Sequence, residues 1–159
     1  RSFIETENKE ILNSFGKKLS IAMDKVNKLI PKKPISESKA MEIHEIRSEN
    51  EFSGTVFSSK DTSWTVVISK NDKLEKPCFS RVVFLKSISN ATDLSTFNNK
   101  KIQTIGIVMN KEKRLKLIDT LSLHGGDRSP TVGDMSAYEN PWDGMFVMDR
   151  LVKWVTTYD

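Results

Sequence analysis

Side chains able to bind metals or to act as nucleophiles are scarce in this sequence. Its 159 residues include one cysteine, Cys78, and two histidines, His44 and His124. A single cysteine cannot form a disulfide within the chain, and it cannot supply the several thiolates of a structural zinc site. Neither histidine lies in a recognisable catalytic triad, and the carboxylates show no metal-binding spacing. We therefore expect a reducing compartment and predict no metal site.

Long apolar runs and a secretion signal are also missing. Lysine or glutamate interrupts every apolar segment, so nothing approaches the roughly 18 consecutive apolar residues of a membrane span. The sequence opens with Arg1 rather than methionine, and its start lacks the basic end, apolar run and cleavage site of a signal peptide. These features predict a cytoplasmic protein without a membrane span, and a sequence that is a piece of a longer chain.

The composition that remains is that of a compact domain. Hydrophobic residues make up 37% of the sequence and charged residues 29%, which is enough apolar surface to offset the entropy of the chain. The length suits one hydrophobic core. We predict a single domain over residues 1–159, with a long helix and connector in residues 1–35 and an α/β core in residues 53–155.

The net charge of +4 is spread over the sequence with one exception. Between residues 100 and 116, one acidic residue, Glu112, faces six basic ones: Lys100, Lys101, Lys111, Lys113, Arg114 and Lys116. Such a cluster can attract an anion, although a solvated helix face looks the same. A polyanion- or nucleic-acid-binding α/β module is therefore an alternative function. We nevertheless expect no nucleic acid partner, because the three tryptophans lie within apolar patterns rather than among the basic residues.

Helical spacing of apolar residues predicts a long first helix over residues 3–30. Pro31 and Pro34 end it, because proline disfavours the helical conformation of the preceding residue and cannot donate to a helical ladder. After this connector, we expect a short helix through residue 47, capped by Ser36 or Ser38.

Strand patterns follow these helices. Runs rich in β-branched and aromatic residues predict strands over residues 53–57, 63–69 and 81–88. The polar segment between the first two has the length of a hairpin loop. Trp64, Val66 and Ile68 should share one face of the second strand, since side chains alternate along a strand. The third strand is apolar on both faces, as in a buried parallel sheet.

The second half of the sequence alternates strand and helix patterns, typical of parallel strands with crossover helices. We expect a short helix, a strand, a helix and a strand at residues 91–97, 102–109, 111–123 and 129–132, and a final helix from Asp143. Asn110 should cap the helix at 111–123, and Leu115, Ile118 and Leu121 should form its inward face. The buried side of the final helix should comprise Met145, Met148, Val152 and Val155. The predicted fold is thus α/β: a three-layer arrangement with a mixed, mostly parallel sheet.

Glycines and polar side chains concentrate between residues 124 and 144. The candidate substrate-binding residues are His124, Gly125, Gly126, Arg128, Trp142, Asp143 and Gly144. Loops that leave the strands of an α/β sheet are common ligand sites. Gly125 and Gly126 would let the backbone approach a phosphate or carbonyl, and Arg128 would clamp an anion.

Each of these residues also has a purely structural interpretation. Gly125 can simply end a helix. Asp143 can cap the next helix, and Arg128 can pair with Asp127, Asp134 or Asp149. The glycine spacing matches no nucleotide-binding loop. Cys78 has no adjacent base, so we predict an inert, partly buried thiol. The sequence alone identifies no catalytic and no cofactor-binding residue.

The order of several motifs resembles acyl-CoA reductases similar to the fatty-acid reductase of luminous bacteria, the LuxC-like family. These motifs are Trp64-Thr65-Val66-Val67, Pro77 with Ser80-Arg81-Val82-Val83, Ile102-Gln103-Thr104-Ile105-Gly106-Ile107, His124-Gly125 with Arg128 and Met135, Trp142-Asp143-Gly144, and Leu151-Val152-Lys153-Trp154-Val155. The resemblance covers residues 54–155 and rests on motif order.

This resemblance implies a fold like the catalytic domain of aldehyde dehydrogenases. It also implies that a cysteine takes the acyl group as a thioester before hydride from NADPH releases a fatty aldehyde. The nucleophile, the general base and most of the NADPH site should then lie upstream of Phe3, and Cys78 does not match the nucleophile's motif. The chain would be the C-terminal catalytic-domain portion of an NADPH-dependent long-chain acyl-CoA reductase, not competent alone.

The resemblance further implies an acyl-CoA or acyl-protein thioester as substrate, a homo-oligomer and an acyl-transferring partner protein. An oligomerisation or partner-docking domain is accordingly another alternative function. The expected final helix has more apolar side chains than one buried face needs, so part of it would be free to meet a partner. These side chains are Met145, Phe146, Met148, Leu151, Val152, Trp154 and Val155.

Overall fold

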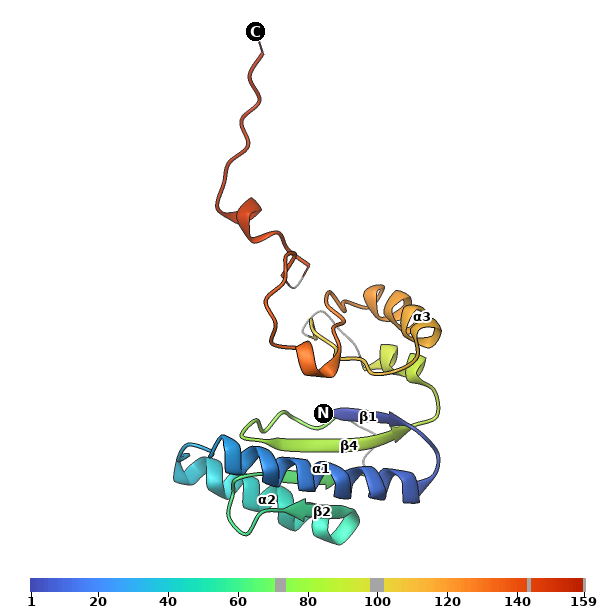
Figure 1. The fold of residues 1–159 in the computed structure, drawn as a ribbon, viewed down its shortest axis with the longest axis vertical. Coiled ribbons are helices and arrows are strands. Elements are labelled where there is room, and N and C mark those ends of the chain that lie inside the picture. Colours follow the sequence, from blue (N-terminus) through green and yellow to red (C-terminus); the bar gives the residue numbers. More distant parts are fainter. Residues whose placement is uncertain (71–73, 98–101, 143, 159) are drawn as a thin grey trace. The chain divides into compact units, whose positions relative to one another are not determined.

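The computed structural model describes residues 1–70, 74–97, 102–142 and 144–158. Its chain divides into two compact units, Arg1–Asn90 and Ala91–Asp159. Figure 1 shows the elements of both units. The expectation that residues 1–159 form one domain stays a prediction. No helix in the described ranges has the length and apolar character needed to cross a membrane.

The first unit is built on a four-stranded sheet. In order across the sheet, its strands are β1 (Ser2–Glu5), β4 (Val82–Ile88), β3 (Thr65–Ile68) and β2 (Thr55–Ser58). The central strand β4 is parallel to both β1 and β3, whereas β2 is antiparallel to β3. The predicted α/β fold with a mixed, mostly parallel sheet is therefore confirmed for this unit.

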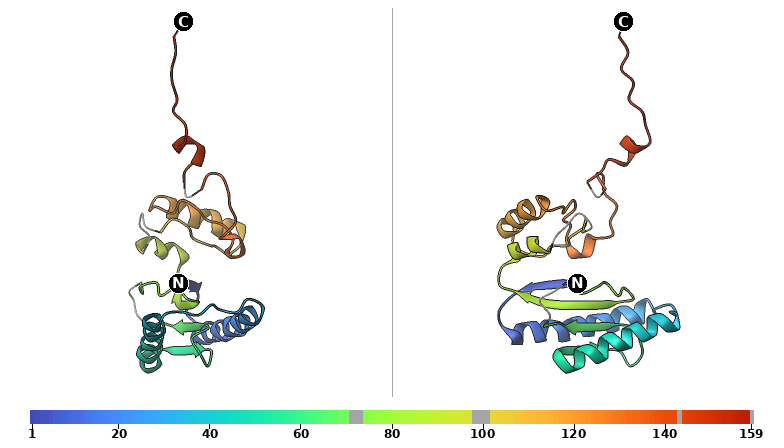
Figure 2. Two further views of the ribbon diagram at one scale, coloured as in Figure 1. Left: turned by 90° about the vertical axis from the view of Figure 1, so that its left-hand side faces the viewer. Right: turned by 180° about the vertical axis from the view of Figure 1, so that it is seen from behind.

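Two helices, α1 (Lys9–Leu29) and α2 (Glu37–Ser53), cover opposite faces of this sheet (Figure 2). On the α1 face, Leu12 packs in one core cluster with four side chains of the sheet, Trp64, Val66, Ile68 and Leu85. On the α2 face, the fully buried Ile43 is accompanied by Arg47, whose Nε donates to Thr65 Oγ1 at 2.9 Å. The predicted shared face of Trp64, Val66 and Ile68 is thus confirmed, with Thr65 on the other face.

The start of the first helix was predicted wrongly. Residues 2–5 form β1 instead, and Asn8 caps α1 through its side chain, which accepts from the Glu10 N–H. Phe3 and Ile4 fit helical spacing, but pairing with β4 gives their backbone a hydrogen-bonding partner far away in the sequence. The second helix is capped by Ser36, one of the two predicted caps, and it runs past residue 47 to Ser53.

The second unit contains one α-helix and several short turns. The helix is α3 (Lys111–Ser122), and the 3₁₀ turns are η1 (Ala91–Thr96), η2 (Val132–Asp134) and η3 (Val147–Arg150). Asn110 caps α3 as predicted, since its Oδ1 accepts from the Lys113 N–H. The predicted inward face is wrong at Leu115, which is 54% exposed, while Leu117 and Leu121 are buried. Leu115 and Leu117 are two residues apart, so they point to opposite sides of the helix.

The predicted strands at residues 102–109 and 129–132 are not strands in the part of the chain that the structure describes. Their backbones are nevertheless paired in parallel: Arg128 N–H donates to Gln103 O, Ile105 N–H to Arg128 O, and Ile107 N–H to Pro130 O, at 2.9–3.0 Å. Between the described parts of these two segments, one residue pair, Thr104 and Arg128, forms a β-bridge. Pro130 has no N–H and therefore cannot return a bond to the facing segment, which interrupts the ladder.

The predicted final helix is also wrong. Only the turn η3 forms in this region, and Asp143, its predicted start, lies outside the described residues. The four side chains expected on its buried side are all exposed: Met145, Met148, Val152 and Val155. A short amphipathic helix depends on packing for most of its stability, and exposure of these four side chains shows that their apolar face is left without a packing surface.

Candidate functional site

Arg128 is the centre of the candidate site in the second unit. It follows the glycine loop after α3, and it is only 6% exposed. Its Nη1 donates to Met135 O at 2.8 Å, and its Nη2 donates to Ala137 O. Its Nε makes no hydrogen bond but lies 3.5 Å from Glu139 Oε2. Bonds between a charged group and carbonyls are among the stronger ones in proteins, so Arg128 fixes the course of residues 135–139.

The ion-pair partner of Arg128 differs from the three that the sequence predicts. Those are Asp127, Asp134 and Asp149, whereas the structure pairs Arg128 with Glu139. Asp134 instead accepts a hydrogen bond from the Thr131 hydroxyl. The partner could not be chosen from the sequence because it depends on how the segment after η2 folds back.

Two aromatic rings complete the cluster around Arg128. The guanidinium carbon lies 4.5 Å from the centre of the Trp142 ring, a cation–π contact. Tyr138 stacks on Trp142 with ring centres 5.4 Å apart and 16° between the planes. Tyr138 is 72% exposed. Arg128 thus supports an aromatic surface that is open to solvent, and Tyr138 and Glu139 are site residues that the sequence did not reveal.

Gly144 lies close to Asp127, the residue that precedes Arg128. Trp142 and Met145 exchange two backbone hydrogen bonds of 2.8 and 2.9 Å, which closes a tight turn. Within it, Gly144 has a φ of +75°, and a Cβ at this position would lie 3.1 Å from the carboxyl carbon of Asp127. A side chain would be strained there by both conformation and contact. Asp127 and Arg128 therefore contact the turn at two adjacent points.

The remaining predicted site residues lie at the end of α3. Gly125 has a φ of +99° and Gly126 N–H donates to Leu121 O, so the two glycines close the helix. The exposed His124 has its Nδ1 2.8 Å from Thr120 O on its own helix. The structure thus brings Arg128, Trp142 and Gly144 together and leaves His124 on the helix end. Asp143 lies outside the described residues.

Cys78 carries a buried thiol in this structure. It lies in the first unit and is 1% exposed. Burial raises the pKa of its thiol, and the neighbouring carboxylate of Glu42 raises it further. Lys39 pairs with Glu42 and also donates to the backbone carbonyl of Cys78. Both the burial and the Glu42 carboxylate disfavour the thiolate. The side chain is fully buried rather than partly buried as predicted, and its inertness stays a prediction.

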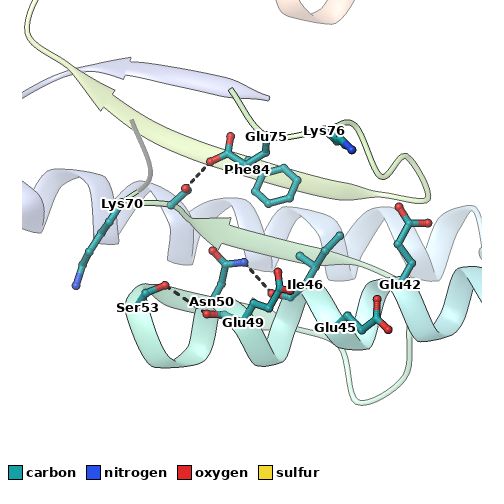
Figure 3. Close-up of a pocket in the computed structure, with 11 residues that line it drawn as sticks. Glu42, Glu45, Ile46, Glu49, Asn50, Ser53, Lys70, Glu75, Lys76 and Phe84 are labelled. Atoms are coloured by element: carbon teal, nitrogen blue, oxygen red, sulfur yellow. Dashed lines mark hydrogen bonds between the residues drawn. The ribbon is translucent and has the colours of Figure 1, made fainter. Parts of the chain in front are cut away.

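The first unit also has a groove of about 430 Å³ beside α2, which sequence reasoning missed (Figure 3). Its α2 wall carries Glu42, Glu45 and Glu49, which lie three and four residues apart along the helix. Opposite them, Glu75 accepts a hydrogen bond from the Ser69 hydroxyl and pairs with Lys86 at 2.9 Å. The wall is acidic and unsuited to an anion. Within the described ranges, no three or more His, Cys, Asp or Glu residues are grouped to hold a metal ion.

Comparison with known families covers almost the whole chain. The family described as acyl-CoA reductase (LuxC) has a model that matches residues 2–154. No curated protein matches the chain. The family match includes β1, α1 and α2, whereas the resemblance predicted from the sequence begins only at residue 54. It also includes Arg128, Trp142 and Gly144, so the cluster described above lies within the matched region.

Proposed function

Because this chain belongs to the LuxC acyl-CoA reductase family, we propose that it is part of the catalytic domain of an NADPH-dependent long-chain acyl-CoA reductase. The family implies acyl-CoA as substrate and NAD(P)H as hydride donor. The product would be a fatty aldehyde, formed by way of a cysteine thioester. A homo-oligomer and an acyl-transferring partner are part of the same proposal, as is a protein of the cytoplasm.

The fold of the first unit supports a relation to the catalytic domain of aldehyde dehydrogenases. Its sheet lies between α1 on one face and α2 on the other, as expected of a three-layer α/β domain. The parallel pairs β1–β4 and β3–β4 require crossover connections. The connection between the first pair contains α1 and α2, whereas the described part of the β3–β4 connection contains no helix.

The observation that carries the site assignment is the contact between Arg128 and Trp142. A buried guanidinium holds an aromatic surface in place while leaving it open to solvent. We propose that this surface forms one wall of the acyl or CoA site. The glycine loop of His124, Gly125 and Gly126 and the turn that contains Asp143 and Gly144 would border the same wall. Arg128 acts as a positioning residue because its donors are directed to protein carbonyls.

The thioester step needs a thiolate, and Cys78 does not provide one. Its thiol is buried, and its pKa is raised. We propose that the nucleophilic thiol is supplied by polypeptide other than these 159 residues. NADPH would supply hydride in the full reaction, but the described residues hold no glycine-rich dinucleotide-binding loop for it. No glycine-rich loop joins a strand to a helix N-terminus here, since Asn8, Ser36 and Asn110 begin the α-helices.

Turnover by the isolated chain tests this division of roles. The 159-residue chain is mixed with a long-chain acyl-CoA and NADPH, and NADPH absorbance is followed together with aldehyde formation. No turnover is expected from the chain or from its Cys78→Ser variant. The proposal would be overturned if the parent chain turned over acyl-CoA and the Cys78→Ser variant did not. That result would make Cys78 the nucleophile.

One observation favours partner docking as a second candidate function. Apolar side chains accumulate on the exposed segment after the Trp142 turn: Phe146 at 54%, Met148 at 60%, Leu151 at 73%, Trp154 at 84% and Val155 at 72% exposure. Exposed apolar stretches of this kind commonly meet a partner. Removal of residues 146–158 should abolish self-association measured by light scattering, if the segment docks on a second copy. If the shortened chain kept the same number of copies per particle as the parent in light scattering, docking on a second copy would be contradicted.

A further inference from the structure

A cluster of cations lies at the end of the first unit where β3 and β4 begin. It combines Lys32, from the connector after α1, with Arg47 of α2 and Arg81, which directly precedes β4. Lys32 Nζ donates to Thr62 O at 2.6 Å and to Ser80 O at 3.2 Å. Arg81 donates to Asn27 Oδ1 at 2.9 Å and to Ile30 O at 2.7 Å. Figure 1 shows that the end of α1 and the start of β4 lie at the same end of the sheet.

This cluster has more positive charge than its surroundings neutralise. The titratable groups that act on Lys32 are the cations Arg81 and Arg47, the carboxylate of Asp61 and the thiol of Cys78, which is neutral while it is protonated. Asp61 is already bonded to the backbone N–H and hydroxyl of Ser63. The acceptors of Lys32 and Arg81 are neutral carbonyl and amide oxygens. Glu51 also acts on Arg47. Three cations and two carboxylates leave an excess of one positive charge, which favours an anion.

The cations retain hydrogen-bond donors for such an anion. A guanidinium has five N–H donors and an ammonium three. Two donors of Arg81 and two of Lys32 are used within the described part of the chain. Arg47, in contrast, is 8% exposed and directs its donors to Thr65, Ser59, Asp61 and Trp64. Lys32 and Arg81 therefore have donors left for a ligand. The buried Arg47 contributes only its positive charge.

An exposed aromatic residue, Phe79, lies two positions before Arg81 in the chain. Phe79, Ser80 and Arg81 all have positive φ values, of 58°, 49° and 60°. Side chains other than glycine adopt this region rarely and at a cost. The result is that Phe79 is 72% exposed, two residues from Arg81, while the adjacent Cys78 is buried. Phe79 precedes Ser80, whose carbonyl accepts from Lys32. An exposed phenyl ring at this position can stack on the base of a nucleotide whose phosphates bind the two cations.

We propose that Phe79, Lys32 and Arg81 bind the adenosine phosphate part of the acyl-CoA substrate. This inference rests on the proposed function for the choice of ligand. The adenine ring stacks on Phe79, and the phosphates accept from Arg81 and Lys32. The same chemistry occurs in NADPH, whose extra phosphate is on the 2′ rather than the 3′ oxygen of the ribose. The two nucleotides therefore need to be distinguished experimentally.

Binding to the full 159-residue chain can be measured by isothermal titration calorimetry with adenosine 3′,5′-bisphosphate and adenosine 2′,5′-bisphosphate. The 3′,5′ compound is expected to bind with one site per chain and at least ten-fold more tightly than the 2′,5′ compound. The variants Lys32→Gln and Arg81→Gln should each weaken binding at least ten-fold. Lys33→Gln, which removes an exposed neighbouring lysine, should leave it within two-fold of the parent.

The variant Phe79→Leu tests the inference independently if Lys32→Gln and Arg81→Gln do not fold. Its side chain is exposed, so the substitution leaves the packing in place, and loss of stacking should weaken binding about five-fold. Equal binding by Phe79→Leu, Lys32→Gln and the parent, or no binding of the 3′,5′ compound, would overturn the inference. Preference for the 2′,5′ compound would assign the cluster to the nicotinamide cofactor instead. An absence of acyl-CoA reduction in a complete enzyme would refute the proposed function but would not change these binding constants.

Discussion

The guanidinium of Arg128 lies 4.5 Å from the centre of the Trp142 ring, and the same guanidinium is bonded to the carbonyls of Met135 and Ala137. One buried side chain therefore organises the whole segment between these residues. As a result, the rings of Tyr138 and Trp142 stack on each other in a segment that contains little regular secondary structure. The candidate site depends on Arg128 for its shape, even though Arg128 itself has no free access to a substrate.

Replacement of Arg128 should therefore loosen the site. Arg128→Gln removes two bonds from a charged donor to carbonyls, and we expect a loss of about 3 kcal/mol in the free energy of unfolding. Urea unfolding, followed by the ¹⁹F signal of fluorotryptophan at Trp142, measures it, with Trp142→Phe to assign the signal. Arg150→Gln, which alters an exposed arginine, should cost less than about 0.5 kcal/mol. Equal losses in both variants would show that Arg128 has no special role.

Arg47 should have a comparable role in the first unit. Its guanidinium joins α2 to the loop between β2 and β3 through Ser59, Asp61 and Trp64. We expect Arg47→Met to reduce the free energy of unfolding by about 3 kcal/mol, since several carbonyls lose a charged donor. Thermal or urea unfolding followed by circular dichroism measures the loss. Lys60→Met is the matched control, because Lys60 is exposed in the same loop, and stability that falls equally in both would count against this role.

Acid should selectively weaken the loop that contains Asp61. Hydrogen bonds from the backbone and hydroxyl of Ser63 lower the pKa of Asp61 from 3.8 to about 2. A carboxyl whose pKa is lower in the folded state stabilises that state above its unfolded pKa, and this contribution is lost as the pH falls from about 4 to about 2. The difference in urea midpoint between the parent and Asp61→Asn should therefore be present at pH 5 and vanish near pH 2. A difference that stays constant over this range would contradict the assignment.

The single thiol should react only when the first unit opens. Cys78 is buried, and its raised pKa keeps it protonated at neutral pH. Iodoacetamide at pH 7.5 should leave the native chain unmodified over hours and label the chain within minutes in urea. Mass spectrometry reports both. Rapid labelling of the native chain would mean that the thiol is accessible and ionised.

Local patterns were sufficient to predict most of the first unit. The alternation of Trp64, Val66 and Ile68 predicted their shared face, which the structure packs against α1, and Ser36 is one of the two caps predicted for α2. The strand β1 was missed, because Phe3 and Ile4 also fit helical spacing and their pairing partner, β4, is distant in the sequence. Periodicity reports which face is apolar, but it does not report which long-range partner will supply the hydrogen bonds.

The candidate site was predicted only in part, because the local sequence does not report contacts between distant segments. Arg128, Trp142 and Gly144 were named from their glycine-rich surroundings, and the structure does bring these three together. Glu139 and Tyr138 were not named, because nothing in the local sequence shows that this segment folds back onto Arg128. The predicted strand at residues 129–132 contains Pro130, whose missing N–H interrupts the ladder there.

Substrate affinity in a complete reductase that contains this sequence tests the central claim most directly. If Arg128 and Trp142 form a wall of the acyl or CoA site, Trp142→Ala should raise KM for a long-chain acyl-CoA about ten-fold or more, with KM for NADPH unchanged. Tyr158→Ala, which removes an exposed aromatic ring outside the cluster, is the control and should behave as the parent. An unchanged KM for acyl-CoA in Trp142→Ala would contradict the account.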